Sequence, residues 1–328
     1  MINRHRIVAG MIAALATVFG QGSAYAQDAG TYPSKTVTLL VPYAVGTGAD
    51  ILSRILGPMM SERWKVPVVT ENRAGASGNI GADFVSKAAP DGHTLLVTAT
   101  SFGTVPALVA TMPFDPIKSF TPVILLATGA LTVVVNPDVP ARTMREFVDF
   151  AKRQPGKLNF PSGGRGGPQH LGMELINLEL GINVVHIPYK EITRGVVDLV
   201  TGQVQVMVSA LQTVAPQVNA GKLRMIGVMS PERARAYPDV PTLNEQGMPN
   251  LQMETWYGVF APAGTPAGIV QKINAELNEN VKQANVRAVL AKQGLDSAGG
   301  TPERFGDLVK MEIPRWKRVA AAAGIKPE

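Results

Sequence analysis

Two glycine-rich segments are the parts of this sequence best suited to chemistry. In the first, Gly46, Thr47 and Gly48 follow the apolar run Val37–Val41 and precede Asp50, which leads into a helical pattern. The start of a helix leaves backbone N–H groups unpaired and carries roughly half a positive charge. The segment therefore predicts a site for an anion such as a ligand carboxylate.

The same pattern occurs again later in the chain. Residues 158–160 form a short predicted strand, residues 161–168 form a loop rich in glycine, and a helical pattern begins at Gln169. The ligand candidates in and after this loop are Ser162, Gly163, Arg165, Gly166, Gly167 and His170. Arg165 is the one cation inside either loop. We expect its side chain to point into a ligand cleft between the two loops and to pair with a second carboxylate of the ligand; the alternative is a solvated loop arginine.

Two further candidates have alternative roles. An ionised Asp50 repels a carboxylate, so it either caps its helix or holds a bridging water. His170, one turn into the second helix, either faces the ligand or is a packing or capping residue.

The other candidates are placed by their position in the chain. Tyr43 and Trp256 either stack on a ligand ring or fill the core behind the loops. Thr100 and Ser101 follow a predicted strand, and Ser209 ends another, so each is a candidate to line the site.

Strands and helices alternate through most of the chain, which predicts an α/β fold with parallel strands. The loops at residues 43–50, 75–81 and 100–103 are then expected to converge at the carboxyl edge of one sheet. Residues 123–127 and 131–135 are predicted to be separate strands. Helices are predicted to start at Thr265-Pro266, with Thr265 as the N-cap, and at Thr301-Pro302, with Pro314 kinking or breaking the last one.

This pattern predicts two lobes. The first contains residues 27–128 and 256–328, and the second contains residues 129–255, with two crossings between them. Residues 1–26 resemble a cleaved signal peptide, because a basic start and a short apolar run precede Ala24-Tyr25-Ala26. The chain has no cysteine, which excludes a lipid anchor on cysteine, thiol catalysis and thiolate metal sites.

The charge and the motifs argue against several other classes of protein. Without Arg4 and Arg6 the chain has 29 basic and 25 acidic residues and no basic cluster of the kind that binds nucleic acid. The sequence around Ser77 lacks the last glycine of a hydrolase nucleophile elbow. The histidines lack metal-ligand spacing, and Ile51 stands where a dinucleotide-binding loop needs its third glycine. We therefore expect no catalytic residue, metal or cofactor.

Several motifs in a fixed order resemble one family. They are Pro42-Tyr43-x-x-Gly46-x-x-x-Asp50, Glu71-Asn72-Arg73-x-Gly75-x-x-Gly78, Pro90-Asp91-Gly92, Gly164-x-Gly166 with His170, His186-x-Pro188-Tyr189, Pro238-Asp239-Val240-Pro241 and Ala261-Pro262-Ala263-Gly264. Together they resemble the Bug family, the extracytoplasmic solute receptors of tripartite tricarboxylate transporters. Thr47 and Gly167 depart from the family, where a second glycine and a Ser or Thr are common.

The resemblance implies a type II periplasmic-binding-protein fold with a hinge and an interlobe ligand cleft. It implies a periplasmic receptor, expected to be a monomer, that binds a di- or tricarboxylate or an aromatic acid and delivers it to integral-membrane transporter subunits. Relatives are said to hold one carboxylate through backbone amides and ordered waters. Two alternatives stay open: an exported hydrolase of carboxylate esters, and a sensor that delivers its ligand to a signalling partner.

Overall fold

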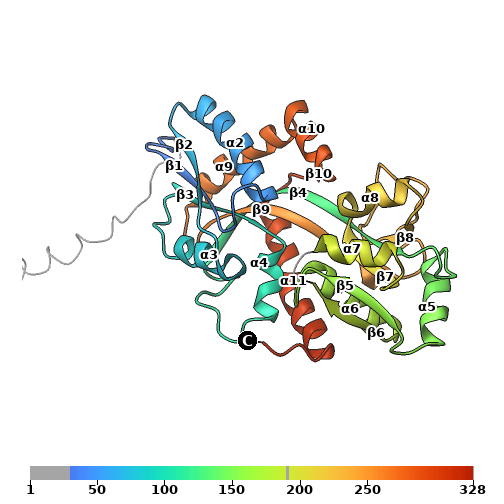
Figure 1. Ribbon diagram of the computed structural model, residues 1–328. Coiled ribbons are helices and arrows are strands. Elements are labelled where there is room, and N and C mark those ends of the chain that lie inside the picture. Colours follow the sequence, from blue (N-terminus) through green and yellow to red (C-terminus); the bar gives the residue numbers. More distant parts are fainter. Residues whose placement is uncertain (1–29, 190–191, 328) are drawn as a thin grey trace, which may run out of the picture.

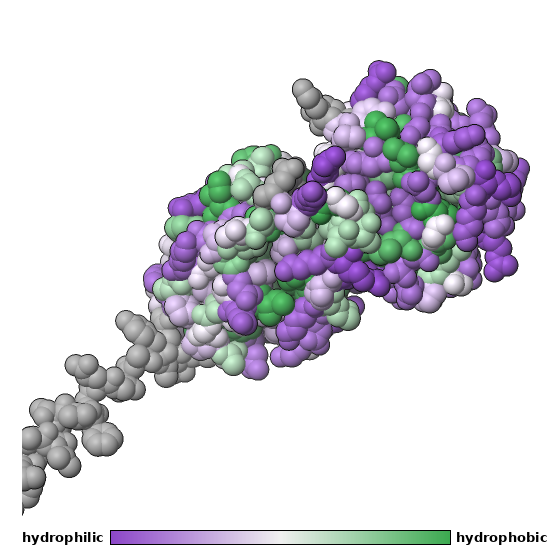
Figure 2. All heavy atoms as spheres, turned by 90° about the horizontal axis from the view of Figure 1, so that it is seen from below, coloured by the Kyte–Doolittle hydropathy of each residue, from purple (hydrophilic) through white to green (hydrophobic). Residues whose placement is uncertain are grey.

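The computed structural model describes residues 30–189 and 192–327. The predicted signal peptide lies outside this part of the chain. The described residues form two α/β lobes joined by long strands (Figure 1). Figure 2 shows two rounded bodies with a narrower junction between them. Among the described residues, no helix combines the length and the hydrophobicity needed to cross a bilayer.

The first lobe is built on a mixed sheet with helices on both faces. Its parallel strands are β1 (Val37–Val41), β2 (Val68–Asn72) and β3 (Thr94–Ala99), with β1 in the middle. Leu39 and Leu40 point to opposite faces and both are buried, because each face packs on helices. The helices are α2 (Gly48–Trp64), α9 (Ala267–Val281) and α10 (Ala284–Lys292) on the Leu39 face, and α3 (Asn79–Ser86) on the Leu40 face.

Two long strands cross between the lobes. The strand β4 (Phe120–Val135) runs without interruption through Gly129, so the prediction of two separate strands was wrong. Its first part pairs with β9 (Glu254–Pro262) and β10 (Leu295–Ser297). Gly129 is needed for close packing, since a Cβ there would lie 2.6 Å from side-chain atoms of Leu295 and Thr255.

The second lobe forms around the other end of β4, which pairs with two of its strands. Its elements are α5 (Met144–Lys152), β5 (Leu158–Ser162), α6 (Pro168–Leu180), β6 (Val184–Pro188), α7 (Ile192–Val200), β7 (Val206–Ala210), α8 (Leu211–Asn219) and β8 (Arg224–Val228). The strands β7 and β8 pair with β4, whereas β5 pairs in parallel with β6. The capping box predicted at Thr143 and Glu146 is present at the start of α5.

The last helix, α11 (Pro302–Ala322), contributes to the cores of both lobes. Phe305 packs with core residues of the first lobe, and Trp316 packs with those of the second. Pro314 lies inside the helix without breaking it. The next residue, Arg315, donates hydrogen bonds to the carbonyls of Gln252 and Asn250, which fixes the helix at this point. Besides β4 and β9, α11 is thus a third element that spans the two lobes.

The remaining elements are short. They are η1 (Ala76–Gly78), α4 (Ser101–Thr104), η2 (Val105–Ala107) and η3 (Pro249–Leu251). The predicted cap of α9 was displaced by one residue: Pro266 is the N-cap, and the hydroxyl of Thr265 donates to the carbonyl of Pro262 instead.

Candidate functional site

Asp50 fixes the conformation of the first glycine loop. It is the third residue of α2 and its side chain is buried. Its Oδ2 accepts the N–H of Gly46 at 2.9 Å, its Oδ1 accepts Nδ2 of Asn72 at 2.9 Å, and Nε of Arg54 lies 3.0 and 3.1 Å from the two oxygens. Gly46 has a φ of +87°, which glycine adopts without strain. The carboxylate therefore holds the loop through groups on three elements.

The electrostatics of Asp50 agree with this role. Burial pushes its pKa up, but the hydrogen bonds from Arg54, Gly46 and Asn72 outweigh burial and hold the pKa below its usual range. The N-cap of α2 is Thr47, whose hydroxyl donates to the carbonyl of Ala44 at 2.8 Å. Asp50 is thus neither the N-cap nor free to face a ligand.

Tyr43 joins the three loops of the first lobe. Its Oη lies 2.8 Å from Oγ1 of Thr98 and 2.6 Å from Oγ of Ser101, and it accepts the N–H of Ala99 at 3.3 Å. Its ring lies against Gly78, where a Cβ would come within 3.0 Å of the ring. Burial raises the pKa of Tyr43 despite these hydrogen bonds, so the phenol stays neutral. Tyr43 thus supports the loop.

Thr100 and Trp256 lie in the interior. Oγ1 of Thr100 accepts the N–H of Trp256 at 2.7 Å, and the Thr100 N–H donates to the Trp256 carbonyl at 3.0 Å. The Trp256 side chain is 1% exposed and its Nε1 donates to Glu312 at 2.8 Å. Of the two roles considered for Trp256, the structure shows the one in the core.

The second glycine loop is held in a closely similar way. The N–H of Gly166 donates to Nδ1 of His170 at 2.9 Å. Gly166 has a φ of +75°, and His170 is the third residue of α6. Gly46 and Asp50 have the same spacing and the same hydrogen bond in the first loop.

Ser162 and His186 support the same loop from the strands below it. Oγ of Ser162 donates to the carbonyl of Gly164 at 2.8 Å, accepts the N–H of Gly164 at 3.2 Å, and lies 2.6 Å from Nε2 of His186. The rings of His186 and His170 are stacked, with centroids 3.7 Å apart and an angle of 16° between the planes. Burial, followed by the neighbouring His170, lowers the pKa of His186 to about 4.

The serine–histidine pair does not have the arrangement of a hydrolase. The Ser162 hydroxyl is buried and already bonded to its own loop, whereas a nucleophile must reach a substrate. No carboxylate within hydrogen-bond distance orients His186 among the described residues. The described residues also contain no group of three or more histidine or acidic side chains placed to hold a metal ion.

Three other predicted site residues differ in their surroundings. Arg165 is exposed and has no ion pair among the described residues, although its charge contributes to lowering the pKa of His186. Gly163 is exposed, and its φ is not in the left-handed region. Ser209 is fully buried and its Oγ has no hydrogen-bond partner within the described residues.

A short helical segment links the two glycine loops. It starts at Ser101, which contacts Tyr43, and α4 and η2 then lead to Leu108. Leu108 packs against Gly166, where a Cβ would lie 2.2 Å from its side chain. The segment is about 12 Å long at the usual rise per residue. The two loops therefore lie near the two ends of this one segment, the first at the carboxyl end of β1 and the start of α2, and the second at the carboxyl end of β5 and the start of α6.

The helix starts leave backbone N–H groups unpaired. The N–H groups of Gly48, Ala49, Gln169 and His170 have no acceptor among the described residues. Sequence reasoning identified both loops but missed Leu108 and the roles of Asn72 and His186. The spacing of the glycines signals the loops, whereas contacts between distant segments leave no local signal.

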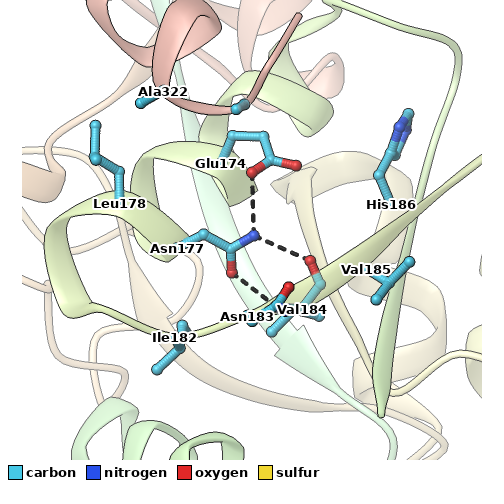
Figure 3. A pocket seen from close by; sticks show the side chains of 10 residues that line it. Glu174, Asn177, Leu178, Ile182, Asn183, Val184, Val185, His186 and Ala322 are labelled. Carbon is cyan, nitrogen blue, oxygen red and sulfur yellow. Dashed lines mark hydrogen bonds between the residues drawn. The ribbon is translucent and has the colours of Figure 1, made fainter. Parts of the chain in front are cut away.

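A separate pocket of about 400 Å³ lies in the second lobe (Figure 3). Its walls come from α6, β6 and the end of α11. Nδ2 of Asn177 donates to Glu174 and to the carbonyl of Val184, as drawn in Figure 3. His186 also lines this pocket, so one histidine borders both the pocket and the glycine loop.

Comparison with known proteins identifies relatives along nearly the whole chain. Residues 52–325 match the model of the tripartite tricarboxylate transporter family receptor. Protein BugT of Bordetella pertussis is 32% identical over 307 residues, which cover 93% of this chain and 94% of that protein.

Solved structures match as well. The R. palustris protein Rpa4515 with adipate is 32% identical, with a TM-score of 0.71, and the match covers 90% of this chain and 100% of that one. MatC from Rhodopseudomonas palustris with bound malate is 33% identical, with a TM-score of 0.68 and coverages of 88% and 99%. A solute-binding protein from Polaromonas with no ligand is 28% identical, with a TM-score of 0.80 and coverages of 89% and 99%.

Proposed function

The chain belongs to the family of tripartite tricarboxylate transporter receptors, and we propose that it is a periplasmic receptor that captures a small dicarboxylate between its two lobes. The observation that carries this proposal is the pair of glycine loops, each held by a hydrogen bond from a glycine to the third residue of a helix. Two helix starts connected through one short segment suit a shared anion.

The proposed ligand class follows from the relatives and from the loop charges. Adipate and malate, bound in two relatives, each have two carboxylates. One carboxylate is bound by the free amides of both loops, each charge-assisted hydrogen bond contributing roughly 1.5–3 kcal/mol before desolvation. The second carboxylate pairs with Arg165. A micromolar complex requires only about −8 kcal/mol in total.

The predicted site residues then separate into two groups. Those proposed to contact the ligand are Thr47, Gly48, Ser101, Gly163, Arg165 and Gly167, together with the backbone N–H of His170. Asp50 and His170 position the loops, because their side chains are buried and bonded to loop amides. Tyr43 and Ser162 support the loops from below.

Ligand capture proceeds by closure of the lobes about β4, β9 and α11, and the closed form is the one that the membrane subunits recognise.

A thermal-shift panel of mono-, di- and tricarboxylic and aromatic acids tests this function. A rise in Tm with dicarboxylates, together with compaction in small-angle scattering at saturating ligand, is the expected result. No shift with any acid would contradict the proposal. Detection of product after incubation with carboxylate esters would favour the hydrolase instead.

Delivery from the periplasm requires export and cleavage of the signal peptide after Ala26. N-terminal sequencing of the protein from a periplasmic extract should give a chain that begins at Gln27. A chain that keeps residues 1–26 and stays with the membrane would contradict this part of the proposal.

A further inference from the structure

We propose that His170 and His186 are a proton-sensitive pair of positioning residues for the second loop, so that acid weakens ligand binding. The inference rests on the proposed function, because it assigns the second loop to the ligand carboxylate. It concerns how acid regulates that same site through the second loop; the first loop is not regulated in this way.

The neutral form of the pair supports the loop as observed. Nδ1 of His170 accepts the N–H of Gly166, so this nitrogen has no proton. The His170 ring is 4% exposed and stacks on His186, whose ring centroid lies 3.7 Å away and whose own ring lies 5.0 Å from that of Phe160. The ring cannot turn away without disturbing this stack.

A proton on Nδ1 of His170 removes the hydrogen bond from Gly166. Nδ1 then becomes a donor that faces the N–H donor of Gly166, and the loop loses its support at that point. The charged ring gains a partner on its other side, since Nε2 lies 3.6 Å from Oε1 of Glu174. Acid thus exchanges a contact that shapes the loop for an ion pair inside α6.

The charges around the pair come from three elements. Glu174 on α6 favours the proton, whereas Arg165 in the loop and His186 on β6 disfavour a second charge nearby. Burial, followed by the charge of His170, lowers the pKa of His186 to about 4, so His186 stays neutral between pH 7 and pH 5. His186 also lines the 400 Å³ pocket of Figure 3, so the pair borders this pocket as well as the loop.

The first loop provides an internal comparison. Asp50 stands in the position of His170, and hydrogen bonds hold its pKa below the usual range despite burial. Its contact with Gly46 therefore survives at pH 5. Only the second loop responds to mild acid.

The test compares adipate binding by the wild type and His170→Asn at pH 7.5, 6.5 and 5.5, by calorimetry. Asparagine keeps an oxygen acceptor for Gly166 but does not titrate. The ratio of the two Kd values cancels the titration of adipate and of all other groups. We expect the wild type to lose roughly tenfold more affinity than the variant between pH 7.5 and 5.5. Glu174→Gln should shift the loss to lower pH.

The other possible results either overturn this proposal or contradict the dicarboxylate function on which it rests. A constant ratio, or a wild type that binds adipate relatively more tightly in acid, would overturn the proposal. Failure of the wild type to bind adipate or malate at pH 7.5 would instead contradict the dicarboxylate function. The pair is then still tested by ¹⁵N NMR of the imidazole rings: an unprotonated Nδ1 of His170 at pH 7.5 that gains a proton by pH 5.5, together with a shift of the Gly166 amide, supports the switch. A Gly166 amide that does not change would refute it, and this measurement requires no variant to fold.

Discussion

Asp50 and His170 are equivalent residues of the two lobes: each is the third residue of its helix, and each accepts the N–H of a glycine four positions earlier at 2.9 Å. The two glycines, Gly46 and Gly166, both have positive φ. Two different side chains thus produce the same loop, one with a carboxylate oxygen and one with an imidazole nitrogen.

Asp50→Asn should lower the free energy of unfolding by about 2–3 kcal/mol at pH 7, because a neutral amide cannot accept from Gly46, Asn72 and Arg54 together. The pKa of Asp50 is depressed in the folded protein, so its contribution is present above the unfolded pKa, near 4, and is lost as pH falls through the folded value. Urea unfolding at pH 7 and pH 3 should show the difference shrinking in acid. Asp149→Asn, at an exposed position on α5, makes the same change in net charge and is the control. It should change the free energy of unfolding little.

Gly166→Ala should destabilise the protein more than Gly46→Ala. Both substitutions place alanine at positive φ, at a cost of about 1–2 kcal/mol. A Cβ added at Gly46 meets nothing within 4 Å, whereas one added at Gly166 would lie 2.2 Å from the Leu108 side chain. We expect an additional loss of about 1–3 kcal/mol at Gly166, measured by thermal or urea unfolding. Equal losses at the two sites would show that Leu108 does not pack on the second loop.

Local patterns predicted the loops correctly, because strand, glycine and helix start are adjacent in sequence. They failed where distant segments decide. Gly129 was interpreted as a break between strands, but it lies in a continuous strand against Leu295, which is far away in the sequence. Pro314 was expected to kink or break α11; the break is wrong, because the helix runs unbroken through this position and packs against both cores.

The candidate site also combines features that local sequence patterns predict with features that depend on distant segments. The i to i+4 spacing of Gly46 and Asp50 can be found in the sequence, and so can that of Gly166 and His170. The stack of His170 on His186, by contrast, requires the pairing of β5 with β6, which no local pattern specifies.

Glu312→Gln should stabilise the protein at high pH. Burial raises the pKa of Glu312 to about 7, against the hydrogen bond from Trp256. A raised carboxyl pKa means that the folded state binds the proton more tightly than the unfolded state does. The stabilisation from this protonation is complete below the unfolded pKa, near 4.5, and is lost as pH rises through the folded pKa of about 7. At pH 8 we expect the variant to be more stable by about 1–3 kcal/mol, with little difference at pH 4.5. Glu62→Gln, exposed on α2, is the matched control; a variant no more stable at pH 8 would contradict the assignment.

Arg165→Ala tests how the second carboxylate is recognised. Arg165 is exposed, has no ion pair among the described residues and lies in the loop that we assign to the ligand. Removing it should weaken binding of adipate or malate roughly tenfold or more, because a charge-assisted pair is lost, while a monocarboxylate of similar length is affected less than threefold. Arg142→Ala, exposed before α5, makes the same change in net charge away from the loop and should leave both affinities unchanged. An equal loss of affinity for mono- and dicarboxylates would mean that Arg165 acts only through the general electrostatic field of the cleft. An unchanged dicarboxylate affinity would make it a solvated loop residue.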